Sequence, residues 1–183
     1  RISSTARNPI YLITIQLVYY RPVRTWRTNA EAGDGRVAYW VSPGTANSFL
    51  SKPVDDFNQF KTDNAKFYVY LPGEISLIKA EASARKNDLA NALIELNKVR
   101  TKATDPAGIG AGLPPKTAAT LPNQGAMLDE IFKQRQYELF ITGLLLGDSR
   151  RFGKPQSDRT RNWLPFPDNE RLSNPNTPAD PAF

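Results

Sequence analysis

The chain has 183 residues, 40% of them hydrophobic and 23% charged, and a formal net charge of +6 from 24 basic and 18 acidic residues. This length and apolar content suffice for one domain with a buried core and exclude a disordered protein. No run of Lys or Arg is longer than two residues, so a nucleic-acid-binding protein is not expected. The chain has no Cys and no His, which excludes disulfides, Cys/His zinc sites and Ser-His or Cys-His catalytic pairs.

The longest apolar run is IYLITIQLVYY at residues 10–20. It is shorter than the roughly 20 residues that a membrane-spanning helix needs, and it lacks the pattern of a signal peptide. Its β-branched and aromatic residues predict a strand that is buried on both faces. The sequence begins at Arg1 and not at Met, so we expect any export signal to lie upstream.

Turn and loop signals follow this run. Gly33-Asp34-Gly35 predicts a turn, and RVAYWV at residues 36–41 predicts a second short strand. Residues 42–64, which contain Pro43-Gly44 and Pro53, are expected to form a loop.

A first helix is expected from Pro72, because proline is tolerated in the first helical turn. Its expected apolar face consists of Ile75, Ile78 and Ala82, with Leu77 and Ala84 beside them. Residues 86–88 interrupt the pattern, and Asp88 is the predicted N-cap of a second helix. The apolar stripe of that second helix is Leu89, Leu93, Leu96 and Val99 or Arg100.

Two helices joined by so short a turn must lie antiparallel. Small residues at the expected crossing, Ala80, Ala84 and Ala92, are typical of a tetratricopeptide-type helical hairpin. One hairpin cannot bury its outer face, so further helices are expected.

Residues 104–125 are rich in Gly and Pro and predict a long loop. The next helix has an expected face of Met127 or Leu128, Ile131, Arg135 and Leu139. The tail, residues 154–183, contains six prolines and is expected to be extended, neither helix nor central strand. The expected anchors of the tail are Trp163, Leu164, Phe166 and Phe183.

Three stretches carry a resemblance to a known family. They are GEISLIKAEASARKNDLANALIELNKVRTKA, LDEIFKQRQYELFITGLLLGDSRRFG and NWLPFPDNERLSNPNTPADPAF. In this order and spacing they resemble the C-terminal part of the SusD/RagB family over residues 67–183, and Asp34-Gly35-Arg36 resembles a D-x-R step that often precedes it. This family consists of lipid-anchored nutrient-binding proteins on the surface of Bacteroidetes-type bacteria.

The resemblance implies a mainly α fold with a tetratricopeptide-like hairpin, further helices, a small β element near the N-terminus and long loops. It implies a single SusD-like C-terminal domain over residues 1–183, divided into a strand- and loop-rich segment (1–66), a helical segment (67–153) and an extended tail (154–183). It further implies a charge network with a structural role. The members of this network would be Glu74, Glu81, Arg100, Arg135, Glu138, Asp148 and Arg151.

The chain also departs from the family pattern. Gln134 and Thr142 stand where the family has Glu, and Leu145 stands where it has Arg. Leu71 replaces the Arg that often precedes the first helix. These changes predict a charge network with fewer charged members. The charges that remain must still be paired, because a lone buried charge is costly.

The function implied by the resemblance is non-catalytic capture of a glycan or oligopeptide. The implied partner is a SusC-like TonB-dependent β-barrel transporter, and the implied location is the cell surface at the outer membrane, through a lipid upstream of Arg1. Neither a cofactor nor a metal is expected. The alternative is a helical-repeat scaffold, an accessory subunit of a larger assembly that binds no ligand.

Candidate ligand contacts come from the residues themselves. Trp26, Tyr39 and Trp40, near Phe49 and Phe57, could stack on sugar rings, and core packing is the competing interpretation. Glu130 and Glu138, which flank Gln134 with Asp129 nearby, could form a glycosidase pair, but paired surface charges give the same pattern.

Neither a calcium loop nor a phosphate-binding loop is expected. The acidic residues Asp34, Asp55, Asp56 and Asp63 lack the spacing of a calcium loop. The glycine-rich residues 108–112 lack the Lys-Ser/Thr of a phosphate-binding loop.

Overall fold

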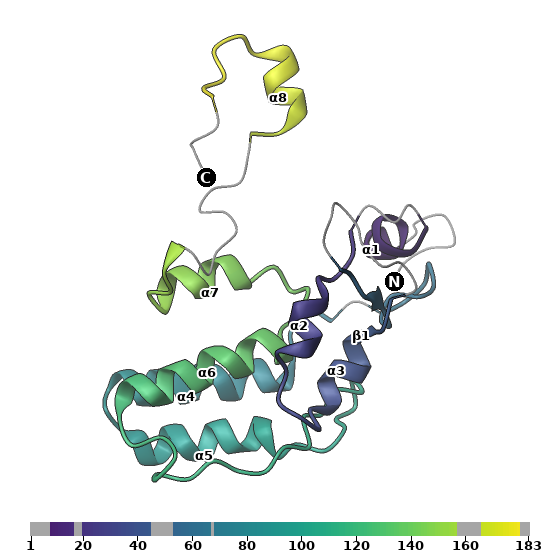
Figure 1. Ribbon diagram of the computed structural model, residues 1–183. Helices are drawn as coiled ribbons and strands as arrows, with labels where there is room; N and C mark the ends of the chain where they lie inside the picture. The colour runs from purple at the N-terminus through teal and green to yellow at the C-terminus, as the bar shows by residue number, and fades with distance from the viewer. Residues whose placement is uncertain (1–7, 17–19, 45–52, 67, 157–165, 180–183) are drawn as a thin grey trace. The chain divides into compact units, whose positions relative to one another are not determined.

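The computed structural model describes residues 8–16, 20–44, 53–66, 68–156 and 166–179. The chain divides into two compact units, residues 1–140 and residues 141–183. The described residues are mainly helical, with one two-stranded antiparallel sheet (Figure 1). The mainly α fold class is therefore confirmed.

Three helices form the core of the first unit: α4 (Pro72–Arg85), α5 (Leu89–Arg100) and α6 (Gln124–Glu138). They lie side by side, and α4 contacts both of the others (Figure 1). Local chemistry sets where each helix begins. Pro72 occupies the first turn of α4, and the side chains of Asp88 and Asn123 accept hydrogen bonds from backbone N–H groups at the starts of α5 and α6. The predicted helical hairpin is confirmed.

The face of α4 that enters the core differs from the prediction. Leu77, Ala80 and Ala84 are fully buried, whereas Ile75 and Ile78 are 45% and 48% exposed. The small alanines let the neighbouring helices approach closely, so the stripe that contains them faces inward. In α5 the buried stripe is Ala92, Leu96, Val99 and Arg100, while Leu89 and Leu93 are half-buried.

The loop from Thr101 to Asn123 contains no helix or strand, as predicted for residues 104–125. It is packed against the helices. Ile109, Ala111 and Leu113 are buried, and the carbonyl of Ala111 accepts a hydrogen bond from the N–H of Gly35 at 2.9 Å. A Cβ atom on Gly35 would lie 2.7 Å from the carbonyl oxygen of Gly110, so this close approach requires glycine.

The predicted strand at residues 10–20 is wrong where it is described. α1 (Pro9–Tyr11) continues into a π-helical segment, η1 (Leu12–Gln16); residues 17–19 lie outside the described residues. The side chain of Asn8 accepts hydrogen bonds from the N–H groups of Ile10 and Tyr11, and Pro9 occupies the first turn. This start signal outweighs the β-branched composition of the run.

The predicted second strand is also mostly helix. After α2 (Arg24–Thr28), α3 (Gly35–Trp40) begins at Asp34, whose side chain accepts a hydrogen bond from the N–H of Arg36. Arg36 and Trp40, four residues apart, are both buried while Ala38 between them is exposed, which is a helical and not a strand pattern.

The sheet is small. Residues Val41–Ser42 form β1, which pairs with β2 (Asp56–Phe57) so that Val41 lies opposite Phe57. β2 lies in the region predicted to be loop.

The second unit contains α7 (Leu145–Arg151) and α8 (Asp168–Ser173). Helix α8 contradicts the prediction of a fully extended tail; its prolines at 167 and 175 flank the helix and do not interrupt it. Of the expected anchors, Trp163, Leu164 and Phe183 lie outside the described residues, and Phe166 is 40% exposed.

Candidate functional site

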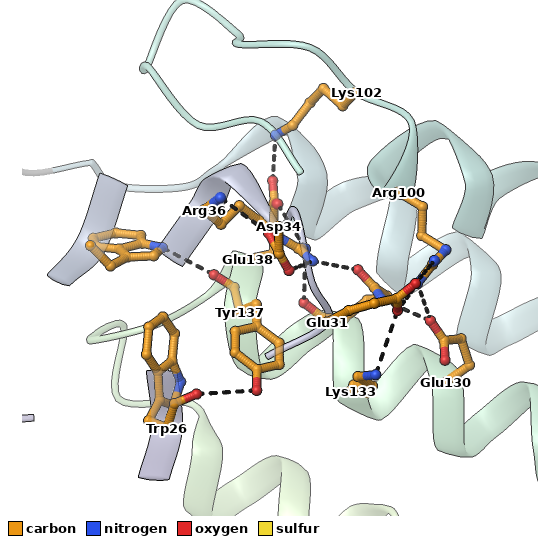
Figure 2. A network of polar contacts seen from close by, with 12 residues as sticks. Trp26, Glu31, Asp34, Arg36, Arg100, Lys102, Glu130, Lys133, Tyr137 and Glu138 are labelled. Carbon is orange, nitrogen blue, oxygen red and sulfur yellow. Dashed lines mark hydrogen bonds and ion pairs between the residues drawn. The ribbon is translucent and has the colours of Figure 1, made fainter. Parts of the chain in front are cut away.

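A buried cluster of polar side chains, the Arg36 cluster, joins α3 to α6 (Figure 2). Asp34 caps α3 and accepts two hydrogen bonds from the guanidinium of Arg36, at 2.9 and 2.7 Å. The same guanidinium donates to the side-chain oxygen of Gln134 at 2.6 Å and to Glu138 at 3.4 Å. Because Arg36 is fully buried, its charge depends on these acceptors.

Glu138 is the second centre of this cluster. Its carboxylate is fully buried and also accepts a hydrogen bond from Lys102 at 2.5 Å. It lies close to the start of α4, where a Cβ atom on Gly73 would be 1.9 Å from Oε1 of Glu138. Gly73 therefore leaves the space that this carboxylate occupies.

A second group, the Arg100 cluster, surrounds the last residue of α5 (Figure 2). The fully buried guanidinium of Arg100 donates to Glu130 at 2.5 Å and to both carboxylate oxygens of Glu31, at 2.8 and 3.1 Å. Lys133 and Lys116 lie 3.5 and 3.9 Å from the same Glu31 carboxylate. The hydrogen bond from Arg100 lowers the pKa of Glu31 to about 2, against the effect of burial and with help from both lysines.

Gln134 connects the two clusters. It is 1% exposed; its side-chain oxygen accepts from Arg36, and its NH₂ group donates to Glu130 at 2.8 Å. A glutamate at this position would place a third carboxylate beside Glu130 and Asp34. The departure from the family pattern at Gln134 thus supplies a neutral bridge that both donates and accepts.

The residues predicted to form the charge network are placed as follows. Arg100 and Glu138 are centres of the two clusters, but they bind other residues and not each other. Glu81 pairs with Arg85 one turn along α4, and Asp148 pairs with Arg151 within α7. Glu74 is half-buried in the first turn of α4, and Arg135 is buried in α6.

The predicted charge network lacked seven of the charged members of the two clusters: Glu31, Asp34, Arg36, Lys102, Lys116, Glu130 and Lys133. Arg36 had a signal in the Asp34-Gly35-Arg36 step, but its partner Glu138 is 102 residues away in the sequence. Glu31 lies 69 residues from Arg100 and carries no local signal at all.

The three aromatic candidates take part in packing within the first unit. Trp40 is 3% exposed, and its indole N–H donates to the carbonyl of Tyr137 at 3.0 Å. Trp26 is half-buried and stacks on Phe140, with ring centroids 4.1 Å apart. Tyr39 is half-buried against Trp40 and donates to the carbonyl of Ala107; burial raises the pKa of Tyr39 well above its usual range.

Two open grooves lie on the first unit. The first, which we name the α2–α3 groove, has a volume of about 510 Å³. Its lining residues are Arg27, Ala30, Glu31, Ala32, Gly33, Asp34, Val37, Ala38, Val41, Ser42, Pro43 and Asn58. The second, the η1–β2 groove, has a volume of about 430 Å³ and is lined by Thr14, Ile15, Arg21, Ser42, Asp56, Phe57 and Lys61.

The described carboxylates that line these grooves are each paired with a cation. Glu130 and Glu138, the candidate glycosidase residues, line neither groove and are held in the two clusters. Of the carboxylates that do line them, Asp34 is bound by Arg36, and Asp56 is bound by Arg21. Glu31, with its pKa near 2, cannot hold the proton that a general acid must carry near neutral pH.

Within the described ranges, no three His, Cys, Asp or Glu side chains are grouped to hold a metal ion. Asp55, one of the acidic residues considered for calcium, is instead bound by Arg24 and Arg27. None of the helices in the described part of the chain combines the length and apolarity needed to cross a bilayer.

Comparison with known proteins identifies the family. The model of the SusD family matches residues 20–179, which is most of the chain. The chain belongs to the SusD family. No curated protein and no solved structure matches this SusD-family chain. The match reaches back to residue 20, so beyond residues 67–183 it also includes α2, α3, the whole lining of the α2–α3 groove and, except for Thr14 and Ile15, that of the η1–β2 groove. Proteins of the SusD family are nutrient-binding proteins of the cell surface.

Proposed function

We propose that this chain belongs to a surface protein that captures a glycan or an oligopeptide and delivers it to a TonB-dependent β-barrel transporter of the outer membrane. The observation that carries the proposal is the family match over residues 20–179. The protein would be held at the cell surface by a lipid on an upstream residue. The transporter, and not this protein, would supply the energy for uptake.

In the proposed role the protein binds its ligand and does not catalyse a reaction on it. Carboxylates are the only side chains here that could serve glycoside hydrolysis by the usual acid–base pair, because the chain has no His and no Cys. The described carboxylates at the grooves are engaged by arginines at short range. A binding surface needs shape and hydrogen-bonding groups only, and both grooves fall within the usual volume range of ligand sites, about 300–1,000 Å³.

The test measures whether the protein binds a polysaccharide or peptide, and then whether the bound ligand is recovered intact. The full chain is run through native gels that contain one polysaccharide or peptide each, and any ligand that retards it is recovered after long incubation. We expect retardation by at least one ligand and an unchanged chain length of that ligand. Shortened ligand would contradict the non-catalytic role. Trp26 and Tyr39 remain proposed ligand contacts, and Trp26→Ala and Tyr39→Phe belong in the same assay.

A second candidate function, the helical-repeat scaffold without ligand binding, is favoured by one observation. The predicted sugar-stacking residue Trp40 is buried, and Trp26 and Tyr39 are half-covered by their own neighbours. The two functions differ in one measurable way. A scaffold is retarded by none of the ligands yet is recovered with a protein partner.

A further inference from the structure

The two grooves meet on β1. Ser42 lines both of them, and Asn58, at the edge of the α2–α3 groove, accepts a hydrogen bond at 2.7 Å from Lys61 of the η1–β2 groove. A ligand longer than one groove can therefore contact both without leaving the surface. This continuity fits a chain-like ligand better than a compact one.

The charges around the joined grooves are not all paired with one another. Arg24 and Arg27 share a single carboxylate, the fully buried Asp55, and Arg21 binds Asp56. No carboxylate pairs with the exposed ammonium of Lys61 in the described part of the chain. Arg24 and Asp55 line neither groove, and the linings themselves hold the cations Arg21, Arg27 and Lys61 and the carboxylates Glu31, Asp34 and Asp56.

The two carboxylates that line the α2–α3 groove are also paired with cations. Asp34 is neutralised by Arg36, and Glu31 is surrounded by Arg100, Lys116 and Lys133. Neither carboxylate is available to a cationic ligand without breaking these pairs. Every carboxylate of the linings is thus held by a cation, whereas Lys61 has no carboxylate partner among the described residues, and the charge that the grooves leave to a ligand is positive.

The neutral groups of the grooves suit hydroxyl-rich ligands. Ser42 supplies a hydroxyl, and the apolar lining comes mostly from small residues such as Ala38. The polar groups of Asn58 and Thr14 also line the grooves while bonding within the protein, Asn58 to the carbonyls of Ala38 and Val41 and Thr14 to that of Ile10. Deep apolar pockets, which would select the side chains of a peptide, are not part of either groove.

We propose that the two grooves form one elongated binding site that takes an acidic oligosaccharide, one carrying uronate or sulfate groups, in preference to a neutral one. This inference rests on the proposed function and adds to it the charge class of the ligand and the location of its site. Lys61 contacts an anionic group of the ligand, and the α2–α3 groove holds the neighbouring sugar units.

The test compares three ligands of equal length by titration calorimetry with the full chain: a hexagalacturonate, a neutral galactan hexaose and a hexaglutamate. We expect the hexagalacturonate to bind tightest and to weaken as salt is raised, because exposed charges are screened. Lys61→Gln should weaken hexagalacturonate about 3-fold, the usual size of one exposed ion pair, and weaken the neutral hexaose less than that. The control is Lys98→Gln, which removes an exposed lysine of α5 outside both grooves and should change neither affinity.

A second variant tests the groove itself. Ala38 is exposed on α3, so Ala38→Trp fills the α2–α3 groove without entering the core, and circular dichroism melting verifies the fold. We expect at least 5-fold weaker binding of hexagalacturonate. Unchanged affinity in both Lys61→Gln and Ala38→Trp would overturn the proposed site.

The remaining outcomes separate this inference from the proposed function. Equal or tighter binding of the neutral hexaose overturns the acidic preference and leaves nutrient capture standing. Tightest binding of hexaglutamate overturns it in favour of a peptide ligand. Binding of none of the three overturns the inference, and the proposed function is then decided by the polysaccharide and peptide gels and by recovery of the transporter.

Discussion

Glu138 shows how one buried carboxylate can hold several segments together. It accepts hydrogen bonds from Arg36 on α3 and from Lys102 after α5, while itself lying on α6. Its side chain has no access to water, so its charge is compensated by these two cations, which also pair with Asp34 and Asp105 respectively. Glu138 is therefore the residue at which the loss of a single charge should do most harm.

Glu138→Gln keeps the shape and removes the charge. We expect it to lower the free energy of unfolding by about 3–5 kcal/mol, because Arg36 and Lys102 each lose one of their two carboxylate partners at a buried position. The control is Glu95→Gln, which breaks the exposed Glu95–Lys98 pair and should cost less than about 1 kcal/mol. Denaturant unfolding measures both. Equal losses in the two variants would refute the role given to Glu138, as would unchanged thermal melting of the charge reversal Glu138→Lys.

Gly73 packs against the carboxylate of Glu138, so a substitution at Gly73 tests the same buried site. In Gly73→Ala the new methyl group would meet Oε1 of Glu138 at 1.9 Å and would have to displace the buried carboxylate. We expect a loss of about 2–3 kcal/mol, although alanine is the better helix former. In Gly125→Ala the nearest atom is Oδ1 of Asn123 at 3.4 Å, so stability should stay the same or rise. A stabilised Gly73→Ala, measured by thermal melting, would contradict the packing described.

The Arg100 cluster predicts an acid-dependent loss of stability. Arg100 holds the pKa of Glu31 at about 2, below its ordinary value of 4.5. A lowered pKa means that the ionised form stabilises the fold fully above pH 4.5, and that this contribution is lost as the pH falls from 4.5 toward 2.

Glu31→Gln should therefore cost about 1 kcal/mol at pH 7, since the carboxylate is partly exposed, and less at pH 3. Its stability should fall less steeply than that of the unchanged protein between pH 4.5 and 2. The stability of this variant will still depend on pH, because Asp55 and Asp105 also have lowered pKa values. Burial raises these two pKa values, but hydrogen bonds from Arg27 and Lys102 lower them by more. Denaturant unfolding at pH 6, 4 and 3 measures this, and identical slopes would contradict the assignment.

Among the elements, the α4–α5 hairpin could be predicted from the sequence because its signals are local. Pro72 opens α4, residues 86–88 break the pattern and Asp88 caps α5. The inward face of α4 could not be predicted, because it depends on how closely the neighbouring helices approach. The bulky residues Ile75 and Ile78 suggested one face, and the alanines that permit contact lie on another.

Adjacent residues test this face directly. Leu77 is fully buried and Ile78 is 48% exposed. Leu77→Ala should cost about 3 kcal/mol through lost burial and the cavity that remains, and Ile78→Ala less than about 1 kcal/mol. The midpoints of urea unfolding measure both. A larger loss in Ile78→Ala would show that the face suggested by the sequence is the buried one.

The short elements near the N-terminus show where composition misleads. Residues 36–40 are rich in strand-forming residues, yet the Asp34 cap and the buried pair Arg36 and Trp40 make them helical. The same holds for residues 9–16, where Asn8 supplies the cap. In both cases one polar residue before the run decides the structure, and a β-branched composition is the weaker signal.

For the protein as a whole, the family could be identified from the order and spacing of motifs, whereas the ion-pair clusters could not. The clusters join residues that lie 30, 69 and 102 positions apart, and no periodicity within one helix reports such distances. The Asp34-Gly35-Arg36 motif pointed to the right segment but not to its partner. The same limit applies to the grooves, whose lining comes from separate segments between residues 14 and 61.

We propose that this SusD-family protein works at the cell surface with an outer-membrane transporter. The most direct measurement is gentle detergent extraction of the native protein from its source membranes, followed by mass spectrometry of what is recovered with it. The account predicts a TonB-dependent β-barrel protein in equal amount and a lipid-modified form of this protein. Recovery with some other assembly, and without a β-barrel transporter, would contradict it and favour the scaffold function.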